Sequence, residues 1–196
     1  MLFDARRLRP IVACMGMLCC LLAMGQGPRL GTMGKRFWVG YNRVTGGGIP
    51  ATLNINGQPG TTGTVSIPRA GWSTNFTLPA TGITGVALPT SVENTVSEVP
   101  ADKGILVEAA ADVSVVAVIG VHYSSEATAV WPEEALGTHY RTVSYKGVQW
   151  SDLFRSNLLV VATQDGTVVR ITPSVTTANG QPAGVPFTVQ LSAGQT

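Results

Sequence analysis

Four glutamates are the residues of this chain whose spacing could support acid–base chemistry. Glu133 and Glu134 are adjacent in the segment WPEEAL, and Glu93 and Glu98 lie close together in the polar stretch SVENTVSEVP. Two carboxylates that face each other across a cleft can hydrolyse a glycosidic bond, one as the acid and the other as base or nucleophile. Spacing along the chain does not fix spacing in space, so a surface hydrolase acting on polysaccharide is the alternative function that these residues allow.

Other catalytic and metal-binding patterns are missing from the sequence. Its two histidines, His122 and His139, have no cysteine or other histidine near them, and no zinc-protease, calcium-loop, nucleophile-elbow or phosphate-loop motif occurs. The glycine triplet 46–48 is not followed by a helix whose N-terminus could hold a phosphate. We therefore expect no catalytic residue, no metal site and no cofactor, and a protein that is not an enzyme.

Tryptophan offers binding rather than catalysis. Its large ring is enriched in binding hot spots and combines an apolar body with a polar nitrogen. Of the four tryptophans, Trp38 lies in RFWVGY and is expected in the core, whereas Trp150 lies in the polar stretch GVQWSDLFRS. Trp150 is therefore the tryptophan that we expect to contact a ligand.

The first 25 residues have the three parts of a secretory signal peptide. A start with three arginines is followed by the uncharged apolar run 11–24 and by a small-residue cleavage site. We expect cleavage between Gly25 and Gln26, and a protein that is secreted or displayed on the cell surface. The apolar run is too short to cross a bilayer, which takes roughly 20 residues, so we expect no transmembrane span in the mature chain.

The mature chain, 26–196, is expected to be neutral and free of cysteine. All three cysteines lie in the leader, which also holds three arginines and one aspartate, so ten basic and ten acidic residues remain. A neutral chain lacks the basic surface that binds nucleic acid or an anionic membrane. We expect the partner to be an extracellular protein or a glycan, and not a nucleic acid.

Strand and turn residues alternate through the rest of the chain and predict an all-β fold. The predicted strands are rich in valine, isoleucine, threonine and aromatic residues, which suit a half-buried pleated surface. They are 51–56, 63–67, 75–78, 84–88, 104–109, 113–120, 127–131, 140–145, 158–163, 167–172 and 187–191. One helical turn is expected within 131–136, and the pairs Asp165-Gly166 and Asn179-Gly180 predict tight turns.

Part of this pattern occurs twice. GTVSIP and FTLPATG, at 63–68 and 76–82, return about a hundred residues later as GTVVRITP and FTVQLSAGQ, at 166–173 and 187–195. The second copy stops at Thr196, so we expect the all-β domain 26–196 to be incomplete at its C-terminus.

About eight strands fall within one repeat, which favours four-stranded antiparallel sheets repeated as the blades of a partial β-propeller. One blade is expected at 51–88, the next at 104–145 and a third from residue 158 onward. A tandem β-sandwich with a repeat of about 100 residues predicts the same strand spacing and is the alternative architecture.

Several stretches resemble the N-terminal domain of the IgG Fc-binding protein family. They are RFWVGY, KGILVEAAADVSVVAV, ALGTHYRTVSY and LLVVATQDGTVVRITP, and the resemblance runs over 35–196. It implies a domain of the kind found in exported, often bacterial, surface or adhesin-like proteins. EAAADVSV departs from the Asp-Lys-Pro type of turn common in the family, and the resemblance carries no catalytic residue to this chain.

These observations predict an exported, non-catalytic binding or adhesion module. Recognition of a protein or glycan is expected from loops on a rigid β scaffold, where binding residues are most often found. The candidate loops are 44–50, 91–103, 146–157 and 174–184.

Overall fold

The longest strand, β8 (Ile105–Val121), runs through the middle of the main sheet. The computed structural model describes residues 31–43, 51–121, 124–143 and 156–196, all within the unit Gly31–Thr196. The sequence predicted two strands, 104–109 and 113–120, where the structure has one. The segment that joins them, AAD at 110–112, contains neither glycine nor proline, so no such residue interrupts the extended backbone.

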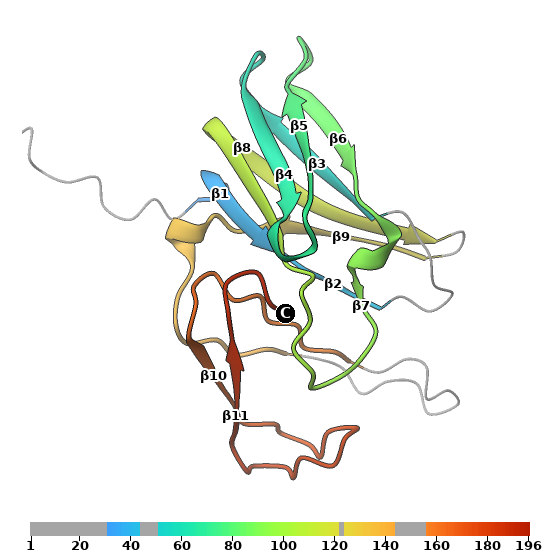
Figure 1. Cartoon of the computed structure of the whole chain (residues 1–196), viewed down its shortest axis with the longest axis vertical. Helices are drawn as coiled ribbons and strands as arrows, with labels where there is room; N and C mark the ends of the chain where they lie inside the picture. Colours follow the sequence, from blue (N-terminus) through green and yellow to red (C-terminus); the bar gives the residue numbers. More distant parts are fainter. Residues whose placement is uncertain (1–30, 44–50, 122–123, 144–155) are drawn as a thin grey trace, which may run out of the picture. The chain divides into compact units, whose positions relative to one another are not determined.

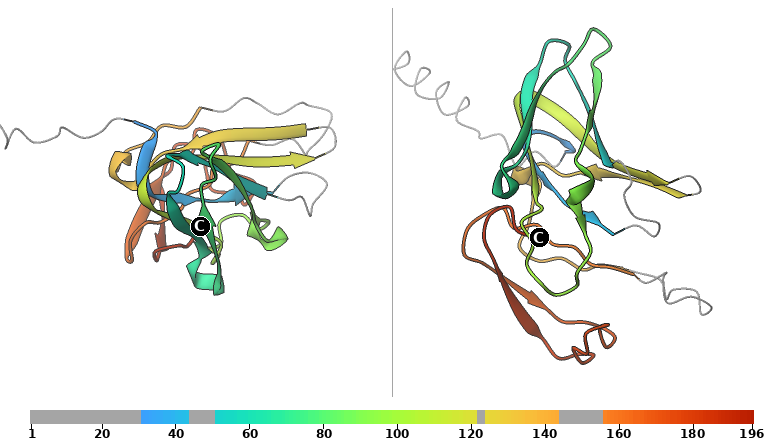
Figure 2. Two further views of the ribbon diagram at one scale, coloured as in Figure 1. Left: turned by 90° about the horizontal axis from the view of Figure 1, so that it is seen from above. Right: turned by 45° about the vertical axis from the view of Figure 1, so that its right-hand side comes forward.

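β8 is long enough to pair with two strands in line on each of its edges. Its first half pairs with β1 (Met33–Val39) and β4 (Thr62–Ile67), and its second half pairs with β3 (Ala51–Gly57) and β9 (Ser124–Val130). All four pairings are antiparallel. Figure 2 shows β8 and β9 running side by side in the view from above.

Two more strands complete a seven-stranded sheet. β5 (Trp72–Thr77) pairs with β4, and β6 (Ile83–Ala87) pairs with β3, which gives the order β5-β4-β8-β3-β6. The sheet folds over so that β5 and β6 come near each other, and the result is a nearly closed, barrel-like sheet (Figure 1).

The all-β antiparallel class is thus confirmed, but the strand pairing corrects the grouping into four-stranded blades. β3 and β4, expected in one blade, both pair with β8, which was expected in the next. Their registers, with Gly57 opposite Val113 and Gly63 opposite Ala109, place them end to end along the same edge of β8. The uninterrupted length of β8 is the physical reason, because it joins segments that the prediction had separated.

Side-chain alternation builds the core of this sheet. In β3 the side chains of Ala51, Leu53 and Ile55 are fully buried, while those between them face outward. Phe37 is also fully buried, and Trp38 is buried as expected from the sequence.

The second copy of the repeated motif forms a separate two-stranded sheet (Figure 2). β10 (Thr167–Ile171) and β11 (Phe187–Leu191) are antiparallel, and both strands were predicted from the sequence. Only Leu191 of these two strands is buried.

The two copies pair in different registers. In the first copy Phe76 lies opposite Gly63, whereas in the second copy Phe187 lies opposite Ile171. Both copies form an antiparallel pair of strands, but the facing residues are not equivalent.

Short elements fill the connections. β2 (Tyr41–Asn42) and β7 (Glu93–Asn94) form a parallel pair. Three 3₁₀ helices lie between strands: η1 (Pro68–Ala70), η2 (Thr90–Val92) and η3 (Glu133–Ala135). The last of these is the helical turn expected within 131–136.

Two predicted strands are wrong over their described residues. Residues 140–143 of the first and 158–163 of the second are not in strands, and 144–145 lie outside the described residues.

Candidate binding surface

The loop between β10 and β11 contains 174–184, one of the four candidate loops. Its tip is a hydrogen-bonded turn in which the N–H of Gly180 donates to the carbonyl of Thr177 at 3.0 Å, and the N–H of Thr177 donates to the carbonyl of Gln181 at 3.0 Å. Gly180 has a φ of 90°, a conformation that suits glycine. The turn predicted from Asn179-Gly180 is therefore confirmed.

The second described candidate loop, 91–103, is held at its end by Asp102. Its Oδ1 accepts hydrogen bonds from Nε of Arg69 at 2.5 Å and from Nε2 of Gln195 at 3.1 Å. The hydrogen bond from Arg69, followed by that from Gln195, holds the pKa of Asp102 below its ordinary value. The loop is thus tied to η1 and to the segment that follows β11.

That following segment, 192–196, also pairs with the loop through its backbone. Thr196 and Ala101 exchange N–H···O bonds of 3.1 and 2.9 Å, and the N–H of Gly104 donates to the carbonyl of Gly194 at 3.0 Å. The hydroxyl of Thr196 donates to Oδ1 of Asn94 at 2.6 Å. These bonds connect the segment that follows β11 to β7, to the end of loop 91–103 and to the residue before β8.

The tips of the two loops touch each other. The hydroxyl of Thr177 donates to Oε1 of Glu98 at 2.7 Å, and Nδ2 of Asn179 donates to the carbonyl of Ser97 at 3.1 Å. We call residues 96–99 and 175–179 the joined-loop surface.

Glu98 has an unusual backbone. Its φ of 61° makes it the one positive-φ residue other than glycine among the residues that the structure describes. Such a conformation costs about 1–3 kcal/mol and is concentrated at functional sites, where the surroundings hold it in place. Here the contacts with the 174–184 loop provide those surroundings.

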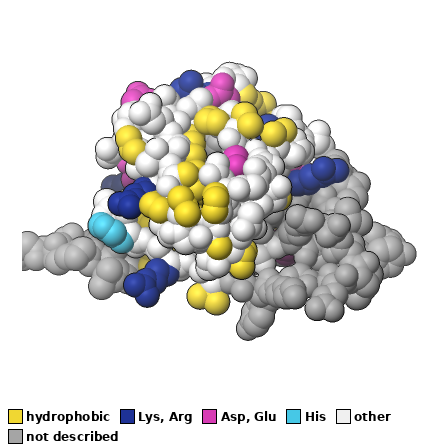
Figure 3. Space-filling view, turned by 90° about the horizontal axis from the view of Figure 1, so that it is seen from below, with side chains coloured by type: hydrophobic (Ala, Val, Ile, Leu, Met, Phe, Trp, Pro, Cys, Tyr) yellow, Lys and Arg dark blue, Asp and Glu magenta, His cyan; other side chains and the backbone are white. Residues whose placement is uncertain are grey.

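Exposed valines flank these contacts. Val96, Val99 and Val175 expose 66%, 57% and 70% of their surface. Figure 3 shows the molecule from below Figure 1, with hydrophobic side chains gathered in the middle of the face and few charges among them. Exposed apolar side chains that gather on one face mark interaction surfaces.

The four glutamates considered for hydrolysis lie in different surroundings. Glu93 is buried in β7 with its Oε1 unpaired, Glu98 belongs to the joined-loop surface, and Glu133 and Glu134 lie in η3. Oε2 of Glu133 lies 2.8 Å from Nε of Arg36 and forms an ion pair. These carboxylates therefore lie on three different elements: β7, the tip of loop 91–103, and η3.

Several predicted residues lie outside the described residues. They include Trp150 and the cleavage pair Gly25 and Gln26, together with the whole 44–50 loop and residues 146–155 of the third candidate loop. Their assignments stay predictions.

Metal sites and membrane-spanning helices were also sought in the described ranges. These ranges contain no group of three histidine, cysteine, aspartate or glutamate residues placed to hold a metal ion. None of the helices found in them is long and apolar enough to cross a membrane.

Sequence reasoning selected both loops but missed the contact between Glu98 and Thr177. The two residues are 79 positions apart, and neither belongs to a recognisable motif. Val96 and Val99, within the polar stretch SVENTVSEVP, were the visible sign that this loop carries apolar side chains without a strand to bury them.

Comparison with known proteins shows a family to which part of the chain is similar. Residues 126–196 match the model of a family described as IgGFc binding protein, and this part of the chain includes β9, β10, β11 and the 174–184 loop. No curated protein and no solved structure matches the chain. The resemblance expected over 35–196 is confirmed for its C-terminal part: residues 126–196 are similar to the IgGFc binding protein family.

Proposed function

We propose that this chain is a non-catalytic binding module that recognises an extracellular protein through the joined-loop surface. The observation that carries the proposal is the fixed contact between loops 91–103 and 174–184, formed at the positive-φ residue Glu98. The family matched by residues 126–196 is described by what it binds, which supports a binding role for the loop that lies in this part.

The structure of this surface suits recognition of a protein. A preorganised surface loses less conformational entropy when it binds, so more of the contact energy appears as affinity. The tips are held to each other by two hydrogen bonds, and loop 91–103 is held at its end by Asp102 and by the pairing of Ala101 with Thr196. The valines then offer apolar area to a partner without first having to be ordered.

The proposed location is outside the cell. The leader, with its expected cleavage between Gly25 and Gln26, supports export. Adhesion is the form of binding that we propose for a surface-displayed module of this kind.

Surface plasmon resonance on the full chain tests the proposal. The immobilised chain is exposed to a set of extracellular proteins, with the IgG Fc fragment first because the family description names it. We expect the double substitution of Val96 and Val175 by serine to weaken binding about tenfold or more, since each valine contributes about 1 kcal/mol of apolar contact.

The matched control is Val143→Ser, at a side chain that is 94% exposed and lies outside this surface. It should bind as the wild-type chain does. Equal affinity of all three proteins for a bound partner would show that the joined-loop surface is not the binding site.

A further inference from the structure

β5 has a free edge. In the described part of the chain it pairs only with β4. The N–H of Leu78 donates to the carbonyl of Thr61 at 2.8 Å, and in an antiparallel ladder every second facing pair is hydrogen-bonded. Counting along the register from that pair, the N–H and C=O groups of Ser73, Asn75 and Thr77 point away from β4 and toward the free edge.

This edge lacks the features that usually protect one. Proteins block exposed edges with charged side chains, proline or bulges. The β5 sequence, WSTNFT, contains no charged residue and no proline, and its register with β4 continues without a bulge from Thr62–Thr77 to Ile67–Trp72. β5 is therefore a ready template for another strand.

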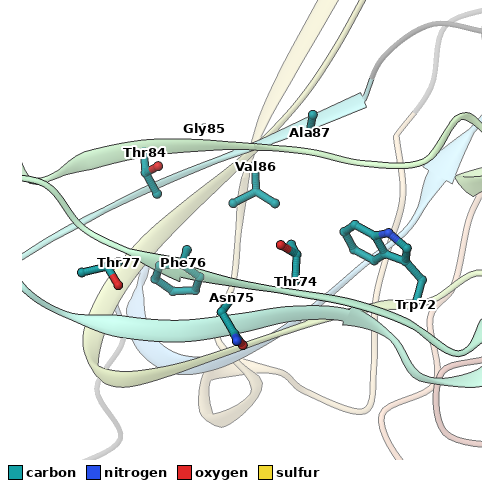
Figure 4. A pocket seen from close by; sticks show the side chains of 9 residues that line it. All are labelled: Trp72, Thr74, Asn75, Phe76, Thr77, Thr84, Gly85, Val86 and Ala87. Atoms are coloured by element: carbon teal, nitrogen blue, oxygen red, sulfur yellow. The ribbon is translucent and has the colours of Figure 1, made fainter.

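The other edge strand, β6, comes near β5 but does not pair with it in the described part of the chain. A hollow of about 380 Å³ lies between the two strands and is lined by Trp72, Thr74, Phe76 and Val86, among others. In Figure 4, Thr74 and Val86 lie in the space between the strands, whereas Asn75 points away from it. Across this hollow β6 faces the inward side chains of β5, and not the backbone edge at Ser73, Asn75 and Thr77.

We propose that this strand is β5 of a second copy, paired antiparallel about a twofold axis at Asn75. Ser73 then lies opposite Thr77 of the partner subunit, and Asn75 lies opposite Asn75 of the partner subunit. These are the residues whose backbone groups are free, so each facing pair exchanges two hydrogen bonds. The two β4–β5 sheets become one continuous sheet.

The symmetric register matches side chains on both faces. On the inward face Trp72 lies opposite Leu78 of the partner subunit and the β-branched Thr74 lies opposite Phe76 of the partner subunit. On the outward face uncharged hydroxyl and amide side chains face each other, and such pairs are favourable across strands. A slip by one residue would place polar side chains against apolar ones.

A second copy also suits the edge electrostatically, because two uncharged strands do not repel each other. β6 is the poorer edge for such pairing. Gly85 lies at its centre, and glycine in a strand offers no side chain to pack. The observations thus favour β5 pairing with itself.

Sedimentation velocity of the full chain tests the dimer, with Asn75→Asp and Asn75→Lys as the variants. Because Asn75 lies on the proposed axis, each variant alone brings two like charges together. We expect a dimer for the wild-type chain, a monomer for each variant alone, and a dimer again when the two variants are mixed. Recovery in the mixture shows that both variants are folded.

The matched control places the same charges at Gln190, an exposed position in β11; these variants should dimerise as the wild-type chain does. Hydrogen exchange provides the second measurement, and the amides of Ser73, Asn75 and Thr77 should be protected in the dimer. A monomeric wild-type chain, a dimer unaffected by charge at Asn75, or an edge protected only by an added foreign peptide would each overturn the proposal.

Discussion

Thr177 donates its hydroxyl to Oε1 of Glu98 at 2.7 Å and so joins two loops that lie 79 residues apart in the chain. The contact connects the β10–β11 unit with the loop that precedes β8. It is also formed where the backbone is strained, at the positive φ of Glu98. At Glu98 the side-chain hydrogen bond therefore stabilises the fold, whereas the positive φ of the backbone destabilises it.

Substitutions of Glu98 separate the two contributions. Alanine and glycine both remove the hydrogen bond, but glycine adopts a φ of 61° at little cost, whereas alanine does not. We expect Glu98→Gly to be more stable than Glu98→Ala by about 1 kcal/mol, measured by urea denaturation. Equal stabilities would mean that the positive φ is not strained in the folded chain.

Asp102 should make the stability of the chain depend on pH. The hydrogen bond from Arg69, and next that from Gln195, lower its pKa from the ordinary value of 3.8 in the folded state. A carboxyl with a depressed pKa stabilises the fold above its unfolded-state pKa, and this stability is lost as the pH falls through the folded-state value.

The variant that tests this effect is Asp102→Asn, which cannot ionise. Between neutral pH and values below 3.8, its urea midpoint should fall less than that of the wild-type chain. The difference should be small and should shrink with added salt, because the side chain is 53% exposed. A variant with the same pH profile as the wild type would contradict a role for the Arg69–Asp102 pair.

Gly104 lies where two backbones approach closely. A Cβ at this position would lie 2.6 Å from the carbonyl oxygen of Gly194, so Gly104→Ala must push the two segments apart. We expect a loss of about 1–3 kcal/mol, the usual cost of overpacking. Thermal unfolding measures it, together with faster hydrogen exchange at Thr196.

Gly137→Ala is the control for this substitution. Nothing lies within 4 Å of a Cβ at position 137, and its φ is not in the left-handed region. The control should be neutral or slightly stabilising, since alanine has fewer unfolded conformations than glycine. Similar melting temperatures for the two variants would show that the 192–196 segment is not held against Gly104.

Local sequence predicted the strands far better than their partners. Alternation in ATLNIN and TVVRIT is a local property, and both became strands, β3 and β10. The pairing depended on β8 as one strand, which no local pattern distinguishes from two. The blade interpretation failed at this step, because a continuous β8 pairs with β3 and β4 in line.

Two local errors have physical causes. β1 was missed because its sequence, MGKRFWV, places Lys35 and Arg36 before the buried Phe37, and a register shift between Gly34 and Arg36 breaks the alternation. LLVVAT was predicted as a strand, but in the described part of the chain Ala162 bonds through its backbone to Gly194 and Gln195, a local contact and not a ladder. Of the joined-loop surface, the sequence identified the two loops but not the bond between them.

The glutamates provide the last prediction, because they decide between binding and hydrolysis. Each of Glu93, Glu98, Glu133 and Glu134 is replaced by glutamine, and each variant is assayed for glycan cleavage and for thermal stability. A binding module has no cleavage activity to lose. A cleavage activity abolished by a single one of these substitutions would instead support the hydrolase.

Stability should separate the variants even without activity. Glu93 is buried with an unpaired Oε1, and a buried charge without a full set of partners is costly, so Glu93→Gln should melt at the same temperature as the wild type or higher. Glu133→Gln removes the ion pair with Arg36, whose side chain is 47% exposed, and should cost less than about 1 kcal/mol. If Glu93→Gln were instead the most destabilised of the four variants, the Glu93 carboxylate would have to be paired in the folded protein. Its charge would then stabilise the β2–β7 pair.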